Sequence, residues 1–181
     1  MDIHKGLANA NKLGNRVVLE ALDHVDLRVA SIQGGGLRNA IPRESKTTLV
    51  CAKEDFAALE AALAESRDTL KAEYATTDPD LTVEWNSAAL PSQVMGEEDQ
   101  YALLLAIQTC PVGIHRMSPD IAGLVQTSNN LARVDVQDGQ VEIQCLNRSS
   151  VDSEKDDHAR SIEAAFALAG RPEPSEAPGG Q

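Results

Sequence analysis

Aromatic residues are scarce in this sequence: two Phe, two Tyr and one Trp amount to 3% of its 181 residues. A core must therefore be built from aliphatic side chains, and the 42% content of hydrophobic residues is enough to fill one. Basic residues are outnumbered, since 16 Lys and Arg stand against 28 Asp and Glu. The resulting net charge of −12 repels phosphate backbones and anionic lipids, so we predict no nucleic-acid partner and no membrane partner.

Long apolar runs and a cysteine framework are missing as well. No run approaches the length of a bilayer span, and the first residues do not follow the pattern of a signal peptide. The three cysteines, Cys51, Cys110 and Cys145, are odd in number and widely separated. That is typical of reduced thiols and not of disulfides or a zinc knuckle. These features predict a cytoplasmic protein.

Apolar periodicity predicts both helices and strands. Helical spacing of apolar residues predicts helices over 2–22, 54–74, 97–108 and 152–169. Apolar runs and alternation predict strands over 26–33, the end of 38–52, 81–85, 131–137 and 140–148. Asp138-Gly139 is a strong hairpin signal between the last two strands. Residues 111–123 are expected to form a loop, and the Pro- and Gly-rich residues 171–181 a disordered tail.

This order of elements predicts an α+β fold. Helices interleaved with antiparallel hairpins favour an open-faced sandwich of mainly antiparallel strands, with the helices on one face. We expect one domain over residues 1–170, with halves of about 1–90 and 91–170.

Motifs for catalysis and metal binding are absent from the sequence. The four histidines, His4, His24, His115 and His158, do not stand at the spacing of a ligand motif. The glycines of "GGG" (34–36) lack the Lys-Ser/Thr pair of a phosphate loop, and no Gly-x-Ser-x-Gly elbow occurs. We therefore predict no catalytic residue and no metal ligand in this chain.

Two polar stretches allow two interpretations. "GGGLRNAIPRES" has glycines that let the backbone approach something closely, and "TSNNLARV" with "CLNRSS" supplies amides and an arginine at expected strand ends. Amides and a guanidinium suit a small polar anion such as a peptide terminus. Alternatively, these Asn and Gly residues form turns, which is the interpretation that the residues alone favour.

Four segments carry a family resemblance: "DIHKGLANANKL", "RNAIPRES", "PVGIHRMSPDIAGLVQTSNNLARV" and "IQCLNRSSVDS". Together and in this order they resemble the lid, or dimerisation, domain of bacterial aminoacyl-histidine dipeptidases. These enzymes belong to the co-catalytic zinc metallopeptidases that include carnosinases. The resemblance runs from Asp2 to about Gly170 and implies a doubled open-faced sandwich of two ferredoxin-like halves.

The resemblance also implies roles for two residues. Asn39, in "RNAIP", matches an asparagine that contacts the bound dipeptide, and Arg148, in "CLNRSS", matches an arginine that holds the substrate's C-terminal carboxylate. Family members bind two zinc ions in a separate catalytic domain, and neither those ligands nor the lid's Gly-Gly-His-Ser-Gly motif occurs here. The lid closes over the substrate and in much of the family mediates dimerisation, so a homodimer is implied.

Three hypotheses follow for the function. The chain is the lid part of a zinc-dependent Xaa-His dipeptidase and is inactive alone, with Met1 marking a cut in a longer protein. Alternatively, it is a free-standing, non-enzymatic module that dimerises or binds small peptides. In the third hypothesis, a separately encoded catalytic domain completes the enzyme.

Overall fold

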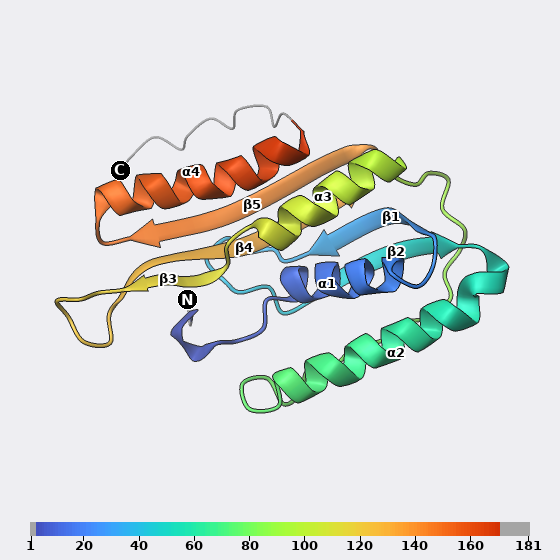
Figure 1. Cartoon of the computed structure of the whole chain (residues 1–181), viewed down its shortest axis with the longest axis horizontal. Helices are drawn as coiled ribbons and strands as arrows, with labels where there is room; N and C mark the ends of the chain where they lie inside the picture. The colour runs from blue at the N-terminus through green and yellow to red at the C-terminus, as the bar shows by residue number, and fades with distance from the viewer. Residues whose placement is uncertain (1–2, 171–181) are drawn as a thin grey trace.

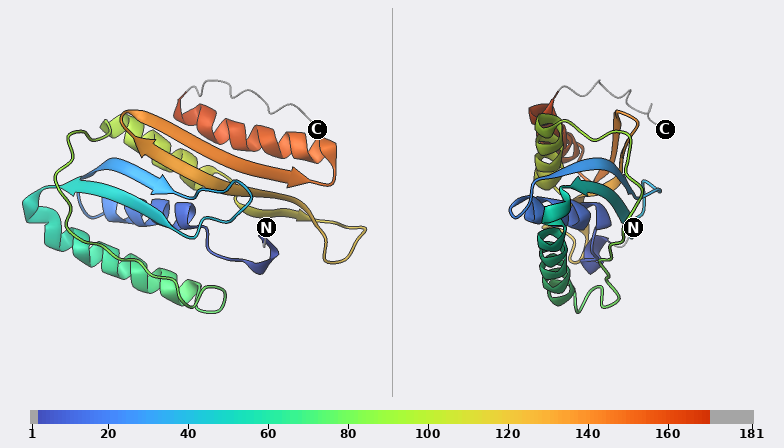
Figure 2. Two further views of the ribbon diagram at one scale, coloured as in Figure 1. Left: turned by 180° about the vertical axis from the view of Figure 1, so that it is seen from behind. Right: turned by 90° about the vertical axis from the view of Figure 1, so that its right-hand side faces the viewer.

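Two layers make up the structure, a computed structural model that describes residues 3–170 (Figure 1). The α-helices are α1 (Ala10–Leu22), α2 (Phe56–Glu73), α3 (Glu97–Thr109) and α4 (Asp152–Ala169). The strands are β1 (Leu27–Gly34), β2 (Ser45–Cys51), β3 (Gly113–Met117), β4 (Val125–Gln137) and β5 (Gln140–Ser149). Short 3₁₀ helices, η1 (Ile3–Lys5) and η2 (Lys53–Asp55), complete the described elements. The helices lie on one side of the sheet, which leaves its other face open (Figure 2).

The sheet is antiparallel throughout, and β4 is its central strand. β5 pairs with β4 along its length, while β1 and β3 share the opposite edge of β4. β3 pairs with the part of β4 from Val125 to Asn129, and β1 pairs with the part from Val134 to Val136. β2 pairs with β1 on its outer side. This five-stranded open sheet with helices on one face confirms the predicted α+β fold.

The order helix–strand–strand–helix occurs twice along the chain. The first set is α1-β1-β2-α2 and the second is α3-β4-β5-α4, with β3 added before β4. Because β1 pairs with β4 and α1 packs against α3, the two sets meet at their inner elements. The division into halves at about residue 90 was drawn from sequence and stays a prediction.

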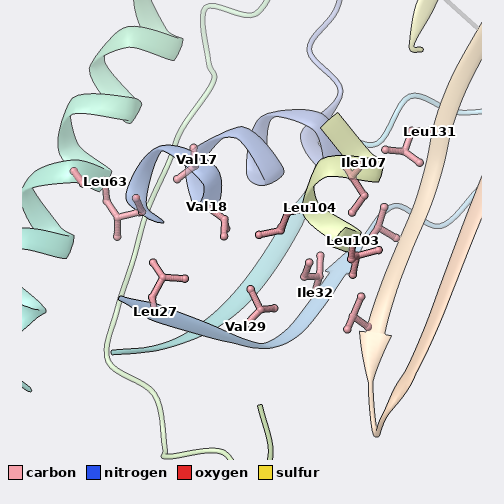
Figure 3. Close-up of a cluster of buried hydrophobic side chains, with 14 of the residues drawn as sticks. Val17, Val18, Leu27, Val29, Ile32, Leu63, Leu103, Leu104, Ile107 and Leu131 are labelled. Atoms are coloured by element: carbon pink, nitrogen blue, oxygen red, sulfur yellow. The ribbon is translucent and has the colours of Figure 1, made fainter. Parts of the chain in front are cut away.

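The core fills the space between the layers with aliphatic side chains, as the low aromatic content requires. Figure 3 shows side chains from α1, β1, α3 and β4 pointing toward one another. The cluster includes Val18, Val29, Leu104, Ile107 and Leu131, all at most 2% exposed. Burying a side chain of this size stabilises the fold by roughly 1.5–3 kcal/mol.

Helix α1 begins later than the periodicity predicted. Gly6 has a φ of +65°, which interrupts a right-handed helix, and Asn9 is extended and caps α1 by accepting a hydrogen bond from the Lys12 amide at 3.2 Å. Among the described residues, the predicted helix over 2–22 is therefore wrong from Ile3 to Asn9, where only the short 3₁₀ helix η1 forms. The spacing of apolar residues does not distinguish the first turn of a helix from a preceding loop that also packs on the core.

Two other predictions are wrong. Residues 81–85 form no strand, although Leu81, Val83 and Trp85 do pack against the core. The alternation of apolar residues in this segment therefore indicates that every second side chain packs on the core, and it does not indicate a strand. Residues 113–117, expected to be part of a loop, form β3 by pairing with β4. The strand expected over 131–137 starts earlier, at Val125, and the expected disordered tail lies outside the described residues.

Candidate substrate-binding face

Arg148 lies on the open face of the sheet. Its neighbour Asn147 faces the helices, because its amide donates to the Lys155 carbonyl at 2.8 Å and its Oδ1 lies 2.9 Å from Nδ1 of His158. Since successive side chains of a strand point to opposite faces, Arg148 points away from the helix layer. The Arg148 side chain is exposed and makes no hydrogen bond or ion pair with any other residue of the range 3–170. A guanidinium in this state is available to an external carboxylate.

Asn39 is held over the same face by a residue of β4. In the β4–β5 ladder Ser128 pairs with Arg148 and Asn130 pairs with Leu146, so Asn130 also points to the open face. Its amide nitrogen donates to the Ala40 carbonyl at 2.7 Å and the Arg38 carbonyl at 3.4 Å. Those two carbonyls flank Asn39, which is itself exposed. The structure thus brings both predicted site residues to one face of the sheet.

The Asn130 amide is fixed in turn by the start of α1. Between the part of β4 that pairs with β3 and the part that pairs with β1, the ladder has a gap. The Asn9 side chain donates there to the Leu131 carbonyl at 3.1 Å and to Asn130 Oδ1 at 3.2 Å. Asn11 donates to the same Leu131 carbonyl at 3.3 Å and to the Gly34 carbonyl at 3.4 Å. Side-chain amides therefore replace the missing strand partner.

The glycines before Asn39 permit a close approach, as the sequence predicted, and what they approach is β4. A Cβ at Gly35 would lie 1.9 Å from the Ala132 carbonyl oxygen, and Gly35 has a φ of +76°. Gly36 has no heavy atom within 4 Å of the same position. Gly35 therefore seats the loop against the strand, and Gly36 lies in open space.

The stretch "TSNN" does not supply exposed amides at a strand end, nor does it form a turn. Thr127, Ser128, Asn129 and Asn130 lie inside β4 and are 0–4% exposed. On the helix side Thr127 shares a hydrogen bond with Ser149 at 2.7 Å and donates another to Glu154, and Asn129 donates to the Pro111 carbonyl at 2.7 Å. Both sequence interpretations were wrong here, because the stretch lies within a strand and the side chains of Thr127, Asn129 and Asn130 bind neighbouring segments of the same chain.

The carboxylate of Glu154 is the most strongly perturbed acid of this region. Hydrogen bonds from Thr127 and Gln126 lower its pKa to about 2, and Arg116 contributes an ion pair at 3.1 Å. Glu154 thereby joins the first turn of α4 to β3 and β4. These contacts are structural and lie on the helix side, away from Arg148.

A metal site is not formed by the described residues. Within the range 3–170, no group of three or more His, Cys, Asp or Glu side chains is arranged to hold a metal ion. His115 and His158 stack with ring centroids 4.3 Å apart, but Nδ1 of His158 is engaged by Asn147. Burial, and then the neighbouring His115, lower the pKa of His158. The donor set that zinc requires is therefore not present in this part of the chain.

None of the helices within residues 3–170 has the length and hydropathy that a bilayer span requires.

Comparison with known proteins shows which family and which proteins this chain resembles. The model of the family described as "peptidase dimerisation domain" matches residues 1–78. The chain is 34% identical over 169 residues to the cytosol non-specific dipeptidase of Escherichia coli (strain K12), a match that covers 93% of this chain and 35% of that protein. It is also similar to the crystal structure of the aminoacylhistidine dipeptidase from Vibrio alginolyticus, with a TM-score of 0.88 and 34% identity.

That structural match covers 93% of this chain and 34% of the Vibrio chain. The chain thus spans about a third of the length of both relatives. The resemblance inferred from four sequence segments is confirmed by these matches. Together they show that residues 1–78 match a peptidase dimerisation domain and that 93% of the chain is related to about a third of each of these two dipeptidases.

Proposed function

We propose that this chain is the lid of a zinc-dependent Xaa-His dipeptidase: it covers the bound dipeptide and supports a cytoplasmic homodimer. One observation carries the proposal: Arg148, whose side chain has no partner among the described residues, lies on the same open face of the sheet as the loop that presents Asn39. The relatives' names support a dipeptide substrate, and the family's description supports dimerisation.

In this proposal Arg148 binds the C-terminal carboxylate of the dipeptide. Its guanidinium offers two parallel N–H donors to a carboxylate, and no carboxylate of the described residues competes for them. Asn39 offers one donor and one acceptor, which suit the peptide group of the same ligand. Neither residue activates water.

Hydrolysis therefore needs groups from elsewhere. Two zinc ions would supply the activated water and polarise the scissile carbonyl. The residues in the range 3–170 do not form a site for them. We expect the purified chain to leave β-alanyl-histidine intact when zinc is added. Measurable hydrolysis would contradict the lid proposal and favour a self-sufficient enzyme.

Binding of the carboxylate is tested with a matched pair of ligands. Purified chain is titrated with β-alanyl-histidine and with its C-terminal amide, and amide-proton NMR shifts report the affinity. Replacing Arg148→Ala removes charge-assisted hydrogen bonds worth about 1.5–3 kcal/mol, which is roughly a 10- to 150-fold weaker affinity for the acid. The amide should be affected little.

Arg160→Ala is the control, because Arg160 is exposed on α4 and unpaired within residues 3–170. It should bind both ligands like the parent chain. Circular dichroism should show that Arg148→Ala stays folded, since that side chain has no described partner. Equal affinity of Arg148→Ala and the parent chain for β-alanyl-histidine would refute the carboxylate assignment.

A further inference from the structure

Two thiols from different layers lie next to each other inside the protein. Cys110 ends α3 and is 1% exposed, and Cys145 lies on β5 opposite Leu131. Their sulfur atoms are 3.9 Å apart. Both are free thiols, as is the third cysteine, Cys51. A disulfide requires the sulfurs to approach to about 2.05 Å, so the two side chains are within about 2 Å of bonding distance.

The local backbone permits this approach. Cys110 is the residue after the last turn of α3 and has left helical geometry, with φ −54° and ψ 118°. Its side chain is therefore not confined by a following helical turn. Cys145 is the more accessible of the two, since it is partly buried whereas Cys110 is enclosed. A small oxidant would reach Cys145 first.

The surroundings make Cys145 the more acidic thiol of the pair. A hydrogen bond from the Cys110 thiol lowers the pKa of Cys145, and the same bond, together with burial, raises the pKa of Cys110. The Lys12 ammonium donates to the Cys110 carbonyl at 3.0 Å and to two carbonyls of the last turn of α3. A cation at this position stabilises negative charge on either sulfur.

We propose that Cys110 and Cys145 form a reversible intramolecular disulfide when the protein meets hydrogen peroxide. The Cys145 thiolate attacks the peroxide O–O bond, which breaks to give a sulfenic acid and hydroxide, and the hydroxide takes a proton to become water. The Cys110 sulfur then displaces hydroxide from the sulfenic sulfur as its own proton leaves, which gives the second water. Two thiols are oxidised and one peroxide is reduced to two waters.

This bond would connect α3 directly to β5. It would close the loop from residue 110 to residue 145, which contains β3, β4 and the turn between β4 and β5. Closing a loop of this length restricts the unfolded chain, so the oxidised protein should resist denaturant better than the reduced one. The inference is independent of the proposed dipeptidase function, because it uses neither Arg148 nor Asn39.

The experiment treats the purified full chain with a small excess of hydrogen peroxide and then quenches it with an alkylating reagent. Two of the three thiols should escape alkylation, and peptide mapping should join Cys110 to Cys145. The intact mass measured before alkylation should be about 2 Da lower than that of the reduced protein, because the disulfide forms with the loss of two hydrogens. Dithiothreitol should restore both thiols. The urea midpoint should rise on oxidation and return on reduction.

Three variants sharpen the test. Cys51→Ser should still form the bond, because Cys51 is distant from the pair in the sequence and lies on β2. Cys110→Ser and Cys145→Ser should each prevent it, and Cys110→Ser should instead leave a sulfenic acid that dimedone labels at Cys145. Three thiols remaining after peroxide, or a bond that always includes Cys51, would overturn the proposal. Mapping of the parent chain decides this even if a variant does not fold.

Discussion

Replacing Gly35→Ala should destabilise the protein through the loop that holds Asn39. The added Cβ would lie 1.9 Å from the Ala132 carbonyl oxygen, whereas a real Cβ contact essentially never falls below 3.0 Å. The loop must therefore retreat from β4 by about 1.1 Å, the difference between these two distances. That movement also stretches the hydrogen bond from the Gly35 amide to the Glu44 carbonyl, which measures 3.2 Å.

The magnitude follows from these changes. An L-residue at the φ of +76° costs about 1–2 kcal/mol, and a weakened backbone hydrogen bond costs about 0.5–1.5 kcal/mol. We expect a total loss of about 2–4 kcal/mol in the free energy of unfolding, with the steric retreat included. With a urea slope of about 2 kcal/mol per M, the midpoint should fall by about 1–2 M.

Gly36→Ala is the matched control, because its Cβ would meet nothing within 4 Å. Its free energy of unfolding should stay within about 0.5 kcal/mol of the parent. Gly35→Asn separates the two causes, since Asn tolerates a left-handed φ better but carries the same Cβ. If Gly35→Ala and Gly36→Ala unfold at the same urea concentration, the close approach to β4 does not determine the loop's position.

Two further predictions concern the contacts around this face. Asn130→Ala removes the donors to the Arg38 and Ala40 carbonyls and should lower the free energy of unfolding by about 1–3 kcal/mol. Hydrogen exchange of residues 37–44 should quicken, and unchanged exchange would refute the anchoring role. Glu154→Gln tests the depressed pKa of Glu154, which is about 2. Because this pKa lies below the ordinary value of 4.5, the ionised carboxylate stabilises the folded protein. The parent chain loses that stabilisation as the pH falls from about 4.5 to about 2. The difference in stability between parent and variant, measured by urea titration at several pH values, should shrink over that range, and a constant difference would refute it.

Sequence periodicity predicted the regular elements well where one face of an element is buried. The helix expected over 152–169 is Asp152–Ala169, and the one over 97–108 is Glu97–Thr109. The hairpin expected at Asp138-Gly139 also forms, with φ values of 53° and 74° at these residues. These features depend on local spacing and turn chemistry, which a single sequence contains.

The elements that periodicity missed depend on contacts from distant parts of the chain. β3 has almost no buried side chain, so it leaves no alternation to detect, and it exists through its pairing with β4. Residues 81–85 alternate in burial because they pack on the core, yet they pair with no strand. Alternation predicts one buried face, and only the chain fold decides whether a ladder forms.

The candidate site combines both kinds of information. Asn39 and Arg148 were found by resemblance to a family, and their roles stay predictions. Asn130 could not be recognised, because an Asn inside a strand reads as a turn residue until its partners are known. Its 0% exposure is the signal that separates an anchor from a turn, and it requires coordinates.

The position of Asn39 relative to Arg148 depends on amides more than on the sheet ladder. Arg148 is fixed by the continuous pairing of β5 with β4, whereas the loop at 37–40 is joined to β4 through the side chain of Asn130. Asn9, the N-cap of α1, orients that side chain by donating a hydrogen bond to it. A shift at the start of α1 would therefore move Asn39 while leaving Arg148 in place. If the two residues bind one dipeptide, the amide contacts at the gap in the β4 ladder determine the distance between them and therefore which dipeptides fit.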